Sequence, residues 1–109
     1  MSLTISEVMT RIPSAFLAEK AAGVNAVVHF RFTGAEAGEW NAVIHDGRCE
    51  VAQGLPRSRP TISVVSDSGD FLKVASGELD GMKAFMDGKL KITGDLLLAP
   101  KLIQLFRVS

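Results

Sequence analysis

His45 and Cys49 are the pair of residues in this sequence whose types could supply a nucleophile and its base. Between them stands Asp46-Gly47, the strongest short-range signal for a two-residue β-hairpin, because both central positions of a type I′ turn need positive φ. Such a hairpin pairs Ile44 with Cys49 and places His45 on the opposite face of the sheet. Proton transfer between His45 and Cys49 is therefore disfavoured. We interpret His45 as solvent-facing and Cys49 as a small core residue.

The other residues whose side chains could act in catalysis or bind a metal form no catalytic or metal-binding pattern. His29 lies on the same predicted sheet face as His45, where the two could be diagonal neighbours, but two imidazoles without a third ligand make a poor metal site. The glycines match no nucleotide-binding motif. The serines stand in no nucleophile elbow, and the aspartates fall mainly at predicted helix ends, where they act as caps. The sequence predicts no catalytic residue, metal site or cofactor, and hence no enzyme.

The elements that must position any site begin with an amphipathic helix. Thr4-Ile5-Ser6-Glu7 has the pattern of a capping box, and Val8, Ile12 and Phe16 then recur at helical spacing. Pro13 interrupts this stripe, so we expect the helix to kink there or to restart with Pro13 in its first turn.

A three-strand meander follows the helix, because from residue 24 apolar residues alternate with polar ones. A turn is expected over 34–39, and the hairpin turn at 46–47 joins the second and third strands. The residues predicted to face the core are Ala26, Val28, Phe30, Phe32, Trp40, Ala42, Ile44, Cys49 and Val51.

The second half of the chain is predicted to complete one sheet and to cover one of its faces with helices. The expected elements are a loop over 54–60, a strand over 61–65, a helix capped by Asp67 or Ser68 and running to Gly77, a helix between Asp80 and Gly88, a strand over 89–93 and a final helix from 94–95. The lysines of the last strand place it at an edge. Because strands and helices are segregated, the fold class is α+β, with a single five-stranded, mostly antiparallel sheet.

Composition limits the partners. The 109 residues suit one domain, 1–109. Lys plus Arg and Asp plus Glu each number 12, so zero net charge argues against nucleic acid or an anionic membrane surface as the main partner. One cysteine, no apolar run of the roughly 20 residues that span a bilayer, and no visible secretory signal make us expect a cytoplasmic protein. Apolar types make up 47% of the residues before the 10 glycines are counted, whereas a typical soluble domain reaches roughly 45–50% with glycine included. This surplus predicts a ligand cavity, an apolar dimer face or an unusually dense core.

The segment 67–102 resembles the sterol carrier protein 2 (SCP-2) family, most specifically at Gly77-Glu78-Leu79 and at 84–95, which reads AFMDGKLKITGD. Residues 40–47 and the strand after them also fit that family. The resemblance implies a five-stranded sheet covered by helices, with an apolar tunnel between them that holds fatty acyl chains, sterols or other lipids. Pro100 departs from the family by standing inside the last helix, which we expect to start later or to kink. The peroxisomal tripeptide of eukaryotic members is absent, which makes us expect a stand-alone, bacterial-type domain.

The resemblance and the apolar surplus together predict a non-catalytic carrier of an intracellular lipid such as a fatty acid, fatty acyl-CoA, sterol or isoprenoid. We expect a lipid ligand, no nucleic acid, transient membrane contact, and a monomer or weak homodimer. The residues expected to line the lipid site are Phe30, Phe32, Trp40, Ile44 and Ile62 on the sheet, and Phe71, Met82, Phe85, Met86, Leu98, Leu102 and Phe106 on the helices. Head-group contacts are expected from Arg57, Arg59 or Lys101.

A second hypothesis is an interaction module. Such a domain would dock on enzymes of lipid or isoprenoid-quinone metabolism, or would dimerise through an apolar face. Val27, Val43 and Val65 are expected to form a small apolar patch on the otherwise polar outer face of the sheet.

Overall fold

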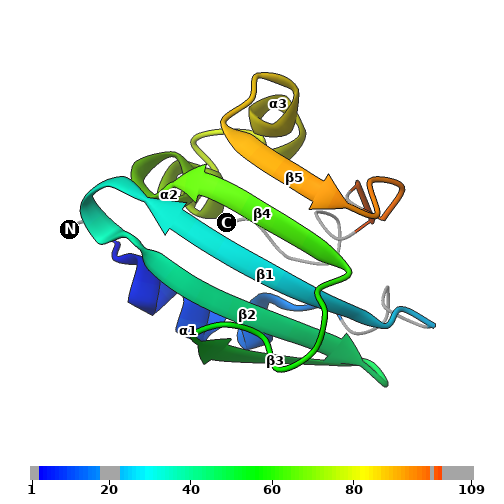
Figure 1. Ribbon diagram of the computed structural model, residues 1–109. Coiled ribbons are helices and arrows are strands. Elements are labelled where there is room, and N and C mark those ends of the chain that lie inside the picture. The colour runs from blue at the N-terminus through cyan, green and yellow to red at the C-terminus, as the bar shows by residue number, and fades with distance from the viewer. Residues whose placement is uncertain (1–2, 18–22, 99, 102–109) are drawn as a thin grey trace.

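The protein folds as one mixed five-stranded sheet with its helices on one side. The computed structural model describes residues 3–17, 23–98 and 100–101. In chain order, the elements are α1 (Ile5–Ala15), β1 (Ala26–Thr33), a single 3-10 turn η2 (Gly34–Glu36), β2 (Gly38–His45), β3 (Arg48–Gln53), β4 (Ile62–Asp67), α2 (Ser68–Ser76), α3 (Gly81–Met86) and β5 (Leu90–Gly94). The strand order is β3-β2-β1-β4-β5. In Figure 1 the sheet faces the viewer and α1 and α2 lie behind it.

The predicted fold class is confirmed. Three of the neighbouring strand pairs are antiparallel, and β1 and β4 form the one parallel pair. The predicted edge strand is β5, at the border of the sheet. Two predicted boundaries were wrong: β2 begins at Gly38, inside the expected 34–39 turn, and β4 continues to Asp67 rather than ending at residue 65.

Helix α1 begins at the predicted capping box. The Thr4 hydroxyl accepts a hydrogen bond from the Glu7 backbone N–H at 3.1 Å, and the Glu7 carboxylate accepts one from the Thr4 backbone N–H at 3.1 Å. The helix does not restart at Pro13, which lies inside it. Proline cannot donate to the carbonyl of Met9, but the helix ends two residues later, so the loss is confined to its last turn.

The β2–β3 hairpin has the predicted turn and register. Asp46 and Gly47 adopt φ of 50° and 71°, as a type I′ turn requires. Ile44 pairs with Cys49, and His45 pairs with Arg48. His45 and Cys49 consequently point to opposite faces of the sheet, as the sequence indicated.

The chain between β3 and β4 crosses the outer face of the sheet, which is turned toward the viewer in Figure 1. The crossing begins where the Asn41 side-chain amide donates to the Gly54 carbonyl at 3.1 Å. It ends where the Thr61 hydroxyl accepts from the Val27 backbone N–H at 3.1 Å. This crossing brings β4 alongside β1 in the parallel direction, and it buries Asn41 on the outer face.

Helices α2 and α3 begin at the predicted caps. The Asp67 carboxylate accepts from the Gly69 N–H at 2.9 Å, and the Asp80 carboxylate accepts from the Lys83 N–H at 3.0 Å. Helix α2 ends at Gly77, whose φ of 87° suits a glycine C-cap. After β5 the chain makes a turn over 96–98, and residues 100–101 are helical. The remainder of the predicted final helix lies outside the described residues.

Candidate functional site

The two faces of the sheet differ sharply in chemistry. Apart from the Cys49 thiol, no described side chain on the inner face, which is turned toward the helices, is ionisable. The inner-face residues, set by the strand register and burial, are Ala26, Val28, Phe30, Phe32, Trp40, Ala42, Ile44, Cys49, Val51, Gln53, Ile62, Val64, Ser66, Leu90 and Ile92. The outer face carries the histidines and the charged residues of the strands. An inner face of this composition can hold apolar groups and offers almost no polar partner to anything else.

Three aromatic side chains join α2 to the inner face. The ring of Phe71 lies 4.8 Å from the ring of Phe32 and 5.8 Å from that of Phe30, measured between centroids. Phe30 and Phe32 stack on each other at 6.0 Å. These separations are typical of favourable aromatic pairs. The cluster fixes the spacing between α2 and the two central strands.

The five sheet residues predicted to line the lipid site all point inward and are buried. Phe71, Phe85 and Leu98 are half-buried and pack against the same core. Met82 and Met86, which we expected to point inward, are 38% and 77% exposed. Leu102 and Phe106 lie outside the described residues. The structure therefore brings eight of the predicted residues to one apolar layer and places two at the surface.

The exposure of the two methionines follows from the length of α3. Six residues make fewer than two turns, and the helix buries Gly81 and Ala84. Met82 and Met86 are four residues apart and share a side of the helix that is turned away from the core. Sequence reasoning missed Met9 as a core residue; it is completely buried, and its spacing of four from Ile5 was the available signal.

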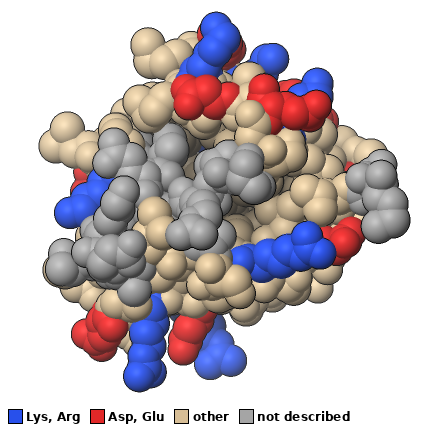
Figure 2. Space-filling view, turned by 180° about the vertical axis from the view of Figure 1, so that it is seen from behind, with Lys and Arg blue, Asp and Glu red and all other residues tan. Residues whose placement is uncertain are grey.

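The helix-bearing side is bordered by charge. Figure 2, which views the molecule from behind, shows described Lys, Arg, Asp and Glu side chains along the upper and lower margins of this side, with further charged side chains at the left and right. Charged groups that stay at the margin keep their hydration, and the layer between helices and sheet remains apolar.

The histidines are engaged in separate pairs on the outer face. The His29 ring lies 3.0 Å from the Glu39 carboxylate, and the His45 ring lies 3.3 Å from that of Asp46. The register sets His29 opposite Asn41, four residues before His45 along β2, so the two histidines are not diagonal neighbours. Within the described ranges, no three His, Cys, Asp or Glu side chains converge on a common point.

The Cys49 thiol faces the core. Burial, reinforced by the nearby Glu50 carboxylate, raises the pKa of this thiol from 9.0 to about 11. A thiol is reactive as the thiolate, so Cys49 is inert near neutral pH.

We expect a thiol reagent to label native Cys49 slowly at neutral pH and to label the urea-unfolded chain at the rate of an ordinary cysteine. Because burial makes the folded-state pKa the higher one, ionisation of the thiol opposes folding, so stability is unaffected at neutral pH and falls as the pH rises from 9.0 towards about 11. Labelling kinetics across this range provide the measurement. Rapid native labelling at neutral pH would contradict the inward orientation.

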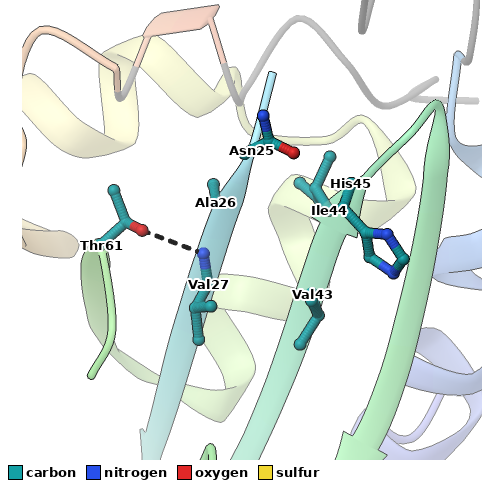
Figure 3. Close-up of a pocket in the computed structure, with 7 residues that line it drawn as sticks. All are labelled: Asn25, Ala26, Val27, Val43, Ile44, His45 and Thr61. Atoms are coloured by element: carbon teal, nitrogen blue, oxygen red, sulfur yellow. Dashed lines mark hydrogen bonds between the residues drawn. The ribbon is translucent and has the colours of Figure 1, made fainter. Parts of the chain in front are cut away.

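A shallow cavity of about 270 Å³ lies at one end of the sheet. Figure 3 shows Val27 and Val43 on neighbouring strands, Thr61 bonded to the Val27 N–H, and His45 at the border. The volume falls just below the roughly 300–1,000 Å³ of sites that enclose small ligands. Ala26 and Ile44 of the inner face also border this cavity, which is too small to enclose a long lipid.

Comparison with known proteins agrees with the geometry. Residues 5–107 match the SCP-2 sterol transfer family. The chain belongs to this family. Members are lipid-binding and lipid-transfer domains, and the uncharged inner face of the sheet is the kind of surface that such binding requires. No helix in the described part of the chain is long and apolar enough to cross a membrane.

Similar proteins include both small SCP-2 proteins and large enzymes. The hydroxysteroid dehydrogenase-like protein 2 of Xenopus tropicalis is 35% identical over 101 residues, which cover 93% of this chain but 24% of that protein. The palmitated SCP2L2 of Aedes aegypti is 25% identical with a TM-score of 0.74, covering 94% of this chain and 93% of that one. A sec-alkylsulfatase from Pseudomonas sp. shares the fold, with 17% identity, a TM-score of 0.80, and coverage of 95% and 16%. The chain thus spans about a quarter of the Xenopus relative.

Proposed function

We propose that this SCP-2 domain binds one long-chain lipid non-catalytically between the inner face of the sheet and the helices, and transfers it between sites inside the cell. The observation that carries this proposal is the inner face itself, which spans all five strands and whose only ionisable side chain is the Cys49 thiol. The Aedes relative supports a fatty acid as the ligand, since that protein was studied in a palmitated form.

The energetics of such a site need no specific polar contact. Burial of a CH₂ group stabilises by about 0.8 kcal/mol, so a sixteen-carbon chain gains about 12 kcal/mol on leaving water. Part of this gain offsets the translational and conformational entropy that the acyl chain loses on binding. Selection among lipids is then a matter of the shape and depth of the apolar layer.

Half-buried side chains are the best candidates to contact the lipid. Phe71, Phe85 and Leu98 pack against the core and also retain exposed surface. A fully buried residue such as Ile62 is already enclosed by protein and supports the site instead. We therefore propose that Phe71, Phe85 and Leu98 line the lipid site and that the buried sheet residues form its floor.

Titration with a fluorescent long-chain fatty acid tests this function, with palmitate and cholesterol as competitors. We expect saturable binding, and a gain of about 2.7 kcal/mol in unfolding free energy at a ligand concentration of 100 times Kd. Phe71→Ala is expected to weaken binding by about tenfold through lost apolar contact. Val65→Ala, on the opposite face of β4, serves as the control and should bind normally. Absence of saturable binding for every lipid tried would refute the proposal.

A second candidate function is a docking module for larger enzymes, and one observation favours it. The Xenopus relative carries a segment similar to this chain within a much longer protein. Val27, Val43 and Val65 are half-buried on the outer face, where a neighbouring domain could pack. Under this function Val65→Ala weakens association with the partner enzyme and leaves lipid affinity intact. Association of this variant with the enzyme therefore distinguishes the docking function from the carrier function.

A further inference from the structure

Two leucines are held out into solvent at one end of the sheet. Leu96 is 51% exposed and Leu97 is 94% exposed, and both belong to a turn directly after β5. The turn is held at its start by a hydrogen bond and at its end by a hydrogen bond and by packing. The Asp95 N–H donates to the Thr61 carbonyl at 3.0 Å, and Leu98, whose N–H donates to the Asp95 carbonyl at 3.1 Å, packs against the core. The leucine pair is therefore presented by a fixed support.

The hydrogen bond between Thr61 and Asp95 also brings the end of the crossing loop to this turn. Arg59 precedes Thr61 by two residues, and Leu97 follows Asp95 by two. Both residues are therefore close along the chain to the hydrogen bond between Thr61 and Asp95, which limits the distance between them. Residues 59–61 and 94–101 together contain two cations, Arg59 and Lys101, against the single acid Asp95. The exposed leucines thus occur at the same end of the molecule as Arg59 and Lys101.

Arg59 and Lys101 are available to an outside partner. Each is exposed, and neither forms an ion pair with another residue in the described part of the chain. By contrast, Lys83 lies 3.7 Å from Asp87, and Arg11 lies 3.8 Å from Glu7. The chain has zero net charge, so this positive excess is local.

We propose that the Leu96–Leu97 turn, flanked by Arg59 and Lys101, is the surface with which this domain docks transiently on anionic membranes. Apolar side chains insert at the boundary between headgroups and acyl chains, and neighbouring cations bind anionic headgroups, as in interfacial membrane-binding segments. A protein partner would require complementary shape, for which the tip of a turn offers little area. The inference rests on the proposed function, since a lipid carrier must meet the membrane that supplies its ligand.

Co-flotation of the full chain with vesicles of phosphatidylcholine, with and without phosphatidylserine, tests the surface. We expect Leu97→Asp to weaken binding to both vesicle types by about tenfold, because the lost apolar insertion is that of a whole leucine. Arg59→Glu and Lys101→Glu should each weaken binding by about fivefold or more, and only when phosphatidylserine is present.

Leu55→Asp is the matched control. Leu55 is 64% exposed on the same crossing loop, but it adjoins Gly54, which bonds Glu39 at the opposite end of the sheet. Its vesicle binding should equal that of the unmodified chain. Urea unfolding of each variant excludes misfolding as the cause of a loss, and substitution at so exposed a site as Leu97 should leave the urea midpoint unchanged.

Fatty acid titration without vesicles separates this inference from the proposed function. If the chain binds the fatty acid but neither vesicle type, or if Leu97→Asp and Leu55→Asp bind vesicles equally, the membrane surface is wrong and the carrier function stands. If vesicles bind through Leu97 while no fatty acid binds, the carrier function fails and the membrane surface stands. Loss of self-association in Leu97→Asp, without any vesicle binding by the unmodified chain, would assign the turn to a protein contact and overturn the proposal.

Discussion

Phe32→Ala is expected to lower the free energy of unfolding by about 3–5 kcal/mol, the usual cost of removing a buried aromatic side chain. Phe32 is only 2% exposed, on the central strand β1, and its ring packs between Phe30 and the Phe71 ring of α2. Truncation leaves a cavity against the rigid sheet and removes the contact that spaces α2 from it. Urea or thermal unfolding measures the loss.

Arg31→Ala is the control for this substitution. Arg31 is the preceding residue of β1, but its side chain is exposed on the outer face, so its removal should change stability by less than about 0.5 kcal/mol. A cost for Phe32→Ala well under 2 kcal/mol would show that α2 closes onto the sheet readily and that the aromatic cluster does not set the width of the apolar layer.

Gly94→Ala is expected to destabilise the protein by roughly 2–6 kcal/mol, from backbone strain and a steric clash together. Gly94 has a φ of 105°, a region that side chains other than glycine rarely adopt. A Cβ at this position would lie 2.5 Å from the Thr61 carbonyl oxygen and 3.0 Å from the Ile62 Cα. Both contacts are with backbone, so neither can be relieved by a side-chain rotation. Thermal unfolding of the variant provides the measurement.

Gly88→Ala measures the backbone strain without the steric clash, and so separates the two contributions. Gly88 also has a positive φ, 81°, but a Cβ there meets nothing within 4 Å, so only the strain cost of about 1–3 kcal/mol applies. If Gly94→Ala were no more harmful than Gly88→Ala, the close approach of β5 to the start of β4 would be contradicted.

Local chemistry accounts for what could be predicted from the sequence. Asp46-Gly47 defined a turn whose geometry fixes the pairing of Ile44 with Cys49. The alternation of side chains along each strand then decided which neighbouring residues face the core. The caps at Thr4, Asp67 and Asp80 were recognisable for the same reason, since a side chain and an amide two or three residues apart suffice to define them. The inward orientation of the predicted sheet residues followed directly.

Non-local pairing was beyond sequence reasoning. Nothing in residues 61–65 shows that this strand pairs with β1 in the parallel direction, because that partner is chosen by the crossing of a distant loop. The orientation of Met82 and Met86 was missed because α3 is too short for its apolar spacing to define a buried stripe. The pattern predicts a final helix that opens at 94–95 and is delayed or kinked by Pro100; the structure has a turn over 96–98, so the exposed leucine pair precedes the helical residues 100–101.

The two neighbours of the central strand β1 lie at very different separations along the chain, and this difference imposes an order on the assembly of the sheet. Phe32 and Gly38 of the β1–β2 pair are joined by a short connection, whereas Val27 and Thr61 are 34 residues apart. The entropy lost on closing a loop grows with its length, so the hairpin side of β1 forms early and the parallel side late. During that interval one edge of β1 presents unpaired amides and carbonyls to any extended chain. Slow folding and aggregation are therefore expected to arise at the same junction.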